Sequence, residues 1–262
     1  MKRAENKDIP AILDYLKKDI ENCLDLYRDI RCYGTDHVDV WYEKTGEDYD
    51  MIAMKYHDSF QVYSDRPLDV DISGVVELLK EYKPAMINSR EELIDRMKAD
   101  FEEDYTSDGG FILRLKRFVS IEDDDFTVEI AGLDDVDELA ELISSDPYYS
   151  DSYTFEEIKS QLEDRMKTDM GVSFISRKDG KIIAHNSITA QVDDIRIAGM
   201  LLVHHDWRHT NLSLIMEKYI IDYVNNQGKK LFGFSTDKRR RKQFEMMGNE
   251  IAAQYGKLIR KA

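Results

Sequence analysis

The sequence contains little cysteine, proline or glycine, and it has no long apolar run. Among 262 residues there are 2 Cys, 4 Pro and 13 Gly, numbers too low for a collagen-like or Pro-rich linker chain. Cys23 and Cys32 fit neither a disulfide framework nor a metal cluster. No apolar run reaches the roughly 18–20 residues that a membrane-spanning helix needs, and no apolar segment follows the basic start as in a secretory signal. We therefore expect a cytoplasmic protein in a reducing compartment that does not bind membranes.

The hydrophobic content is nevertheless high enough for a packed core. Hydrophobic residues make up 42% of the chain, with 15 Tyr and 10 Phe, which argues against disorder although 34% of residues are charged. The length fits one or two domains of about 150 residues. A net charge of -16 opposes binding to nucleic acid or to anionic membranes, so we expect no nucleic-acid partner. The sequence gives no indication of an oligomeric state.

The charge is unevenly distributed along the chain. Residues 206–262 contain 12 Lys+Arg and 6 Asp+Glu, whereas residues 1–205 contain 25 Lys+Arg and 47 Asp+Glu. A basic end on an acidic body suggests a local anion site. The alternative is a solvated charge distribution without a function.

Periodicity predicts two α/β halves. The first half is predicted to contain a helix over 10–31, a strand meander over 38–64, a helix at 72–82, a strand near 85–88, a helix capped by Ser89 and Glu92, and a strand over 111–118. The acidic run 121–125 is a candidate linker. The second half is predicted to contain a strand at 127–131, a helix at 134–145, a helix capped by Thr154 and Glu157, strands at 172–176, 182–190 and 195–203, a helix at 211–226, a strand at 231–235, a helix at 238–247 and a strand near 251–259. The similar order of elements suggests an ancient duplication, with domains over 1–120 and 126–262.

The segment 195–248 has the composition of an anion site. A helix that starts directly after a strand points unpaired backbone N–H groups and the positive end of its dipole at the connecting turn. Such a turn is suited to a pyrophosphate. Here Arg208 supplies charge, Thr210 supplies a hydroxyl, Asn211 tolerates a left-handed backbone, and Ser213 is small enough for close approach. The alternative interpretation is a well-capped helix that binds nothing.

The same stretch resembles the GNAT superfamily of N-acetyltransferases. The acetyl-CoA motif of that family reads approximately Val-x-x-x-aromatic-Arg-x-x-Gly-x-Gly/Ala, and Val203, Trp207, Arg208, Asn211 and Ser213 stand in its places. The later family signature, roughly Tyr-Glu-Lys-Leu-Gly-Phe, is echoed by residues 244–249. The resemblance covers 126–262 in the order of elements and 203–248 in residues. It implies a layered α/β (α+β) fold around a mixed, mostly antiparallel sheet, with an additional N-terminal α/β lobe.

The resemblance also implies a binding site for acetyl-CoA. The strand 195–203 would pair with the pantetheine arm around Leu202 and Val203. The pyrophosphate would lie on the loop residues Arg208, His209, Thr210, Asn211, Leu212 and Ser213. The basic run 238–242, which includes Arg239, would meet the 3′-phosphate. Alternatives for this run are a solvated helix face and, less well supported because no aromatics are interleaved, a nucleic-acid patch.

The chain departs from the family pattern at several positions. Asn211 and Ser213 replace the two glycines of the pyrophosphate loop, and Phe244 replaces a tyrosine that protonates the leaving thiolate. His185 is a candidate general base and Tyr255 a candidate replacement acid, although each has an alternative interpretation as a structural side chain. The spacing of His204, His205 and His209 with Asp206 matches no familiar metal site, so we expect no metal.

The expected function is transfer of an acetyl group from acetyl-CoA to an amine. The acceptor would be a small-molecule or peptide amine, and the acidic body favours a cationic one such as a polyamine, an aminoglycoside or a lysine side chain. The alternative is a catalytically silent GNAT-like binding or scaffolding module, for which the replaced glycines and Phe244 are the evidence.

Overall fold

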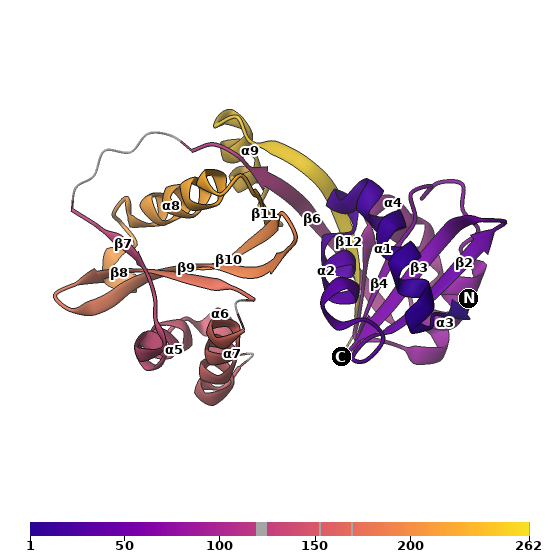
Figure 1. Ribbon diagram of the computed structural model, residues 1–262, viewed down its shortest axis with the longest axis horizontal. Helices are drawn as coiled ribbons and strands as arrows, with labels where there is room; N and C mark the ends of the chain where they lie inside the picture. The colour runs from indigo at the N-terminus through magenta and orange to yellow at the C-terminus, as the bar shows by residue number, and fades with distance from the viewer. Residues whose placement is uncertain (119–124, 152, 169, 262) are drawn as a thin grey trace. The chain divides into compact units, whose positions relative to one another are not determined.

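A computed structural model describes residues 1–118, 125–151, 153–168 and 170–261 (Figure 1). The chain forms two compact units. Unit 1 comprises Met1–Ile112, Ser235–Lys238 and Ile251–Ala262, and unit 2 comprises Leu113–Phe234 and Arg239–Glu250. The acidic segment 121–124 of the predicted linker lies outside the described residues.

Unit 1 is an α/β unit whose sheet has the strand order β1-β2-β3-β4-β5-β12. The strands β4 and β5 are parallel and the other neighbouring pairs are antiparallel. The strands are β1 (Lys2–Arg3), β2 (Asp39–Thr45), β3 (Asp48–Tyr56), β4 (Ser59–Tyr63), β5 (Met86–Arg90) and β12 (Glu250–Arg260). The helices are α1 (Ile9–Leu16), α2 (Leu24–Tyr33), α3 (Ser73–Tyr82) and α4 (Glu91–Met97). The strand β6 (Tyr105–Leu115) leads from unit 1 into unit 2.

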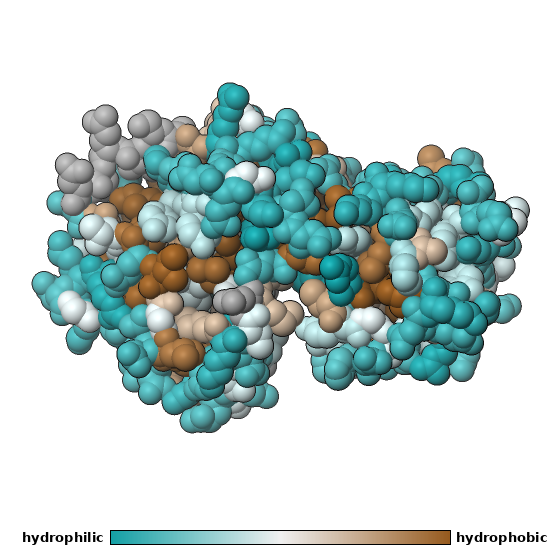
Figure 2. Space-filling model, in the orientation of Figure 1, coloured by the Kyte–Doolittle hydropathy of each residue, from teal (hydrophilic) through white to brown (hydrophobic). Residues whose placement is uncertain are grey.

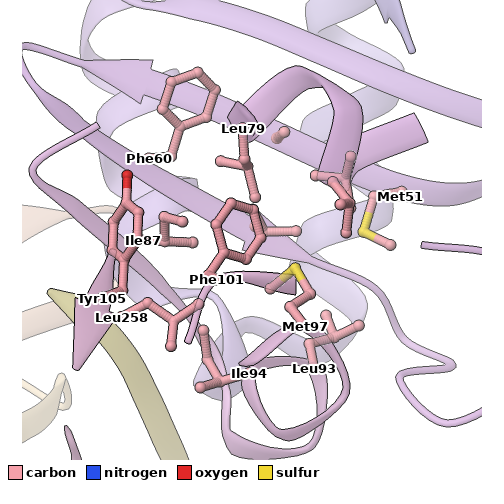
Figure 3. Close-up of a cluster of buried hydrophobic side chains, with 14 of the residues drawn as sticks. Met51, Phe60, Leu79, Ile87, Leu93, Ile94, Met97, Phe101, Tyr105 and Leu258 are labelled. Atoms are coloured by element: carbon pink, nitrogen blue, oxygen red, sulfur yellow. The ribbon is translucent and has the colours of Figure 1, made fainter. Parts of the chain in front are cut away.

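A continuous apolar core stabilises unit 1. Phe60 of β4, Leu79 of α3 and Ile87 of β5 are fully buried within it, and Leu258 of β12 packs in the same cluster (Figure 3). A parallel pair such as β4 and β5 requires a crossover connection, and α3 supplies it. The apolar positions of α3 therefore face the sheet because the crossover lays the helix across it.

Unit 2 has the strand order β11-β10-β9-β8-β7. The neighbouring strands are antiparallel except β10 and β11, which are parallel. The strands are β7 (Val128–Ile130), β8 (Val172–Lys178), β9 (Lys181–Val192), β10 (Ile195–Val203) and β11 (Lys230–Ser235). The helices are α5 (Val136–Ser144), α6 (Pro147–Ser150), α7 (Phe155–Lys167), α8 (Leu212–Asn226) and α9 (Lys238–Met246). The sheet is thus mixed and mostly antiparallel, as predicted.

Helices cover both faces of the unit 2 sheet. The helix α8 lies on one face of β8 to β10, and α5 to α7 lie on the other (Figure 1). Leu139 of α5 and Leu162 of α7 pack with Ile175 of β8 in one apolar cluster, whereas Met216 and Ile220 of α8 are buried on the opposite face. Polar residues cover most of the visible surface (Figure 2). Among the described residues, no helix combines the length and the apolar character that crossing a membrane requires.

The structure corrects two local predictions in unit 1. The predicted helix over 10–31 is interrupted at Asp19, whose φ of -138° and ψ of 50° are not helical. Asp19 accepts a hydrogen bond from the Tyr63 hydroxyl and forms an ion pair with Arg90, so tertiary contacts fix the break. The predicted cap by Ser89 is also wrong. Ser89 is the fourth residue of β5, and its hydroxyl donates to the Val62 carbonyl at 2.7 Å.

Other local predictions are confirmed. The Thr154 hydroxyl accepts from the Glu157 N–H, and the Glu157 carboxylate accepts from the Thr154 N–H, forming the predicted capping box of α7. The strands β8 and β9 form the predicted hairpin, and Asp179 and Gly180 in its turn have φ of 51° and 80°, as a two-residue hairpin turn requires.

The two units share a topology. In each unit, a crossover helix follows an antiparallel meander. The helix leads to a strand that is parallel to the last strand of that meander. The domain ranges 1–120 and 126–262 stay a prediction. The compact units divide the chain elsewhere, since residues 113–118 lie in unit 2 and most of β12 lies in unit 1. There it pairs with β5 from Tyr255↔Arg90 to Ile259↔Met86. The proposed duplication stays a prediction.

Candidate functional site

The strands β10 and β11 of unit 2 separate about halfway along β10. They pair only from Ile195↔Lys230 to Ala198↔Gly233, although β10 continues to Val203. On its other edge, the register of β10 with β9 breaks between Gly199 and Leu202. Between these two residues, Met200 has a φ of 59°, which is strained for a residue with a side chain. Such bulges redirect a strand and are found next to active sites.

A cavity of about 240 Å³ lies where the two strands separate. We call it the inter-strand cavity. Its lining includes residues 198–201 of β10, 233 and 234 of β11, 217, 220 and 221 of α8, 240 and 244 of α9, Asn186 and Tyr149. Glu217 forms an ion pair with Arg240 in the wall of this cavity, and burial raises the pKa of Glu217 while the Arg240 charge opposes that rise. The ion pair therefore joins α8 to α9 inside unit 2.

A second cavity, of about 310 Å³, lies at the turn between β10 and α8. We call it the loop cavity; it is lined by Asp146, Leu201, Leu202, Val203, Trp207, Arg208, Thr210 and Ser213. The Arg208 side chain donates from Nε to the Val203 carbonyl at 3.0 Å and from Nη2 to Asp146 Oδ2 at 3.1 Å. Its charge is therefore already paired in this structure, at a side chain that is 50% exposed.

The N-terminus of α8 opens toward this loop. The N–H groups of Leu214 and Ile215 donate to the Asn211 carbonyl, and the Leu212 N–H donates to the Thr210 hydroxyl at 3.3 Å. The Ser213 N–H has no acceptor among the residues that the structure describes. Together with the helix dipole, that N–H and the Arg208 guanidinium are groups suited to an anion.

A third cavity, of about 370 Å³, lies beside α6 and α7. We call it the helix cavity; it is lined by Tyr149, Tyr153, Ile158, Gln161, Leu162, Arg165, Thr189 and Met200. Tyr149 and Met200 also line the inter-strand cavity, and Leu201 lines both the inter-strand and the loop cavities. The three cavities therefore follow one another through shared wall residues, all within unit 2.

Comparison with solved structures identifies the architecture. A GCN5-related N-acetyltransferase from Sphaerobacter thermophilus superposes with a TM-score of 0.66 at 13% identity, covering 100% of this chain and 96% of that one. An acetyltransferase from the GNAT family of Colwellia psychrerythraea gives a TM-score of 0.65 at 10% identity, with all of both chains covered. A tandem GNAT protein from the clavulanic acid biosynthesis pathway gives 0.64 at 10% identity over 98% of this chain and 96% of that one. The chain has the GNAT fold. No protein-family model and no curated protein matches the sequence.

Within this GNAT fold, the predicted cofactor residues gather partly at one place. Arg208, Thr210, Ser213, Leu202 and Val203 line the loop cavity. His209 and Asn211 are exposed in the turn, and Leu212 is buried at the first position of α8. Arg239 is exposed on α9.

Asn211 does not adopt the left-handed backbone that its side chain would tolerate. Asn211 is the N-cap residue of α8 with a φ of -77°. Ordinary residues adopt this conformation, so the turn does not need a glycine there. The replacement of that glycine therefore costs no backbone strain.

The two predicted catalytic residues lie in different units. His185 is fully buried in β9 of unit 2, with Nε2 at 3.2 Å from the Ser173 hydroxyl and no partner for Nδ1 among the described residues. Burial, reinforced by the Arg165 charge, lowers the pKa of His185 to about 3. Tyr255 lies in β12 of unit 1, where a Cβ on Gly110 would come within 2.6 Å of its hydroxyl.

Two of the three histidines near the end of β10 lie beside Asp206. His204, His205 and Asp206 lie together at the surface, with His205 Nε2 at 3.0 Å from Asp206 Oδ1. One ligand atom from each of these three residues lies within 4.8 Å of the others, so the cluster could hold a metal ion. The expected absence of a metal stays a prediction.

The sequence did not point to Met200, Tyr149, Glu217 or Arg165. The mismatch between a nine-residue apolar strand and a short parallel partner has no sequence signature, so the bulge at Met200 was not predictable. Tyr149 and Arg165 become wall residues of one cavity only because α6 and α7 fold against the end of β10.

Proposed function

We propose that unit 2 transfers an acyl group, most simply acetyl, from coenzyme A to an amine. The observation that carries this proposal is the series of three cavities joined by Leu201, Met200 and Tyr149. A long thioester donor could extend from the α8 N-terminus along β10 to the bulge, while the amine approaches from the helix cavity. The GNAT fold supports the same assignment.

The residues of the loop cavity fit a pyrophosphate in part. The free Ser213 N–H, the dipole of the 15-residue helix α8 and the Arg208 guanidinium favour an anion. Asp146 opposes it, because its carboxylate lines the same cavity and holds Arg208. In this proposal the phosphate competes with Asp146 for Arg208, and Arg239 on α9 meets the 3′-phosphate.

The chemistry requires few groups from the chain. A neutral amine attacks the thioester carbonyl, a C–N bond forms as the C–S bond breaks, and the proton lost by nitrogen ends on solvent or on the departing sulfur. Backbone N–H groups at the β10 bulge are assigned to stabilise the negative charge that develops on the acyl oxygen. Acetyl-CoA would supply the activated thioester, and the protein would supply position and charge stabilisation.

The proton carrier is best assigned to Tyr149. It lines both the inter-strand and the helix cavities, whereas Phe244 has no proton to donate. His185 is a poor general base, because an ordinary ammonium with a pKa near 10.4 does not yield its proton to an imidazole whose pKa is about 3. The role of Tyr255 as an acid stays a prediction.

The test of this proposal is calorimetric titration with acetyl-CoA, followed by measurement of thiol release in the presence of amines. We expect binding tighter than millimolar and amine-dependent release of free CoA. Binding weaker than millimolar would remove the main support for the enzyme.

The second candidate function is a catalytically silent GNAT-like module. The observations that favour it are the two ion pairs Arg208–Asp146 and Arg240–Glu217. They already pair an arginine of the loop cavity and an arginine of the inter-strand cavity with carboxylates. This candidate predicts that no amine accelerates thiol release even at saturating acetyl-CoA. If the protein is an acyltransferase, at least one amine should accelerate thiol release.

A further inference from the structure

The helix cavity contains an arginine that lacks a counter-ion among the residues that the structure describes. Arg165 of α7 is half-buried, and it is the single charged residue in the lining given above. No carboxylate among the described residues pairs with it, and the groups that act on its pKa besides burial are the phenols of Tyr153 and Tyr149. Arginines that leave water are normally paired with carboxylates, and within the described ranges Arg165 has no such partner.

The guanidinium is held in place by neutral groups. Its Nη1 donates to the Met200 thioether at 3.2 Å, and its Nη2 donates to Gln161 Oε1 at 3.1 Å. A thioether is a weak acceptor, and two bonds leave most of the five N–H donors of the guanidinium available. These contacts fix the position of Arg165 without neutralising it.

The Arg165 charge affects the pKa of a neighbouring group. Burial lowers the pKa of Arg165 below its ordinary value, and the Arg165 charge contributes to the low pKa of His185. The described residues around Arg165 therefore do not neutralise its charge. The contrast with Arg177 on β8 is direct, because that arginine pairs with Glu129, Asp135 and Glu138.

Resting on the proposed function, we infer that the acceptor is a small amine that carries a carboxylate, such as a free amino acid, and that Arg165 binds this carboxylate. The planar guanidinium presents a fork of donors that matches a carboxylate. Tyr149, Tyr153 and Gln161 supply further polar contacts around the same cavity. Its volume of about 370 Å³ falls within the roughly 300–1,000 Å³ typical of small-molecule sites.

The position of Arg165 also restricts the length of the acceptor. Its guanidinium contacts Met200, and Met200 is shared with the inter-strand cavity where the thioester would end. The carboxylate and the reacting amine must therefore lie close together, as they do in an amino acid. This local requirement differs from the cationic acceptor expected from the overall charge, because a contact charge acts at short range while the long-range field is screened.

The experiment compares matched ligand pairs that differ only in the carboxylate. Free amino acids are tested against the amines that lack the carboxylate, and against their neutral amides, by thiol release with acetyl-CoA. N-acetyl amino acids are tested against N-acetyl amino-acid amides by calorimetry without coenzyme A. The calorimetric arm needs no transfer activity, so it separates failure of this inference from failure of the proposed function.

We expect the wild-type protein to prefer the carboxylated member of a pair by at least about tenfold, and Arg165→Gln to abolish the preference. Arg165→Lys keeps the charge but loses the fork, and should retain part of the preference. The control Lys167→Gln removes a cation paired with Glu163 on the same helix and should leave the preference unchanged.

Equal treatment of both members, absence of binding by either, or a preference that persists in Arg165→Gln overturns the inference. If thermal denaturation shows that Arg165→Gln is unfolded, the ligand preference is measured in Arg165→Lys instead. A purely structural role of Arg165 would leave the preference unchanged in that variant.

Discussion

The pairing of Arg208 with Asp146 permits a sharp prediction about coenzyme A. The Asp146 carboxylate is 20% exposed, lines the loop cavity and accepts from Arg208 Nη2 at 3.1 Å. If a pyrophosphate binds there, it must compete for Arg208 and lie near a like charge. Replacing Asp146 by Asn removes both penalties while it keeps the size and shape of the side chain.

The magnitude follows from charges at a half-exposed site. Two unit charges about 4 Å apart interact by about 1 kcal/mol in water and by about 4 kcal/mol at an effective dielectric constant near 20. Because Arg208 is 50% exposed, the lower part of this range applies. We expect Asp146→Asn to strengthen acetyl-CoA binding by about 1 kcal/mol, roughly fivefold.

The effects of Asp146→Asn and Arg208→Ala on the affinity for acetyl-CoA should not be additive. Arg208→Ala should weaken binding by about 1 kcal/mol in the natural chain, because Asp146 already occupies the guanidinium. In the Asp146→Asn background, the same change should cost about 1.5–3 kcal/mol, as for a full charge-assisted hydrogen bond. Isothermal titration calorimetry with acetyl-CoA at low and high salt measures all four variants.

One variant of unit 1 serves as the control, and two results would contradict this placement of the phosphate. Arg3→Ala removes an exposed arginine that is paired with Asp39 in unit 1 and should leave the affinity unchanged. If Asp146→Asn weakens binding, or if Arg208→Ala leaves a measurable affinity untouched in both backgrounds, the phosphate does not lie in the loop cavity.

Three further predictions concern the proton carrier and the folded state. Tyr149→Phe should lower kcat about tenfold or more, whereas Tyr255→Phe should affect kcat less; a larger kcat loss in Tyr255→Phe would return the acid role to that residue. His185 stays neutral in the folded state but gains a proton on unfolding below its ordinary pKa of 6.5, so stability should fall as the pH falls from 6.5 toward 3. At pH 5 this contribution should lower the free energy of unfolding, measured in urea, by about 2 kcal/mol. The contribution should be absent in His185→Gln. Gly171→Ala should destabilise by about 1–3 kcal/mol, because a Cβ there would lie 2.5 Å from the Ile188 carbonyl oxygen, whereas Gly132→Ala, with 4.0 Å to its nearest neighbour, should change thermal stability little.

Local chemistry made much of unit 2 predictable. The alternation of apolar residues located β10, and the Thr154 and Glu157 pair located the start of α7. The turn at Asp179 and Gly180 located the hairpin of β8 and β9. Each of these features depends on residues within one or two turns of the chain, so the signal is contained in the local sequence.

Predictions failed where distant residues decided the backbone. The break at Asp19 depends on Tyr63 and Arg90, which lie far along the chain. Ser89 has a capping pattern, but its hydroxyl serves the Val62 carbonyl inside a sheet. The strand β12 belongs to unit 1 because it pairs with β5 there. Strand pairing between remote segments has no local signature, so the sequence could not assign that strand to a unit.

The sequence by itself determined the elements of the candidate site and the loop that we expect to bind an anion, because motif spacing and hydrophobic period are local properties. Only the tertiary structure decided that β10 and β11 separate after Ala198 and that Met200 lies between two cavities. It also decided that Arg208 meets Asp146 while Arg165 meets no carboxylate among the described residues. Charge pairing depends on which side chains come within a few ångströms in space, and that proximity is created by packing rather than by position along the chain.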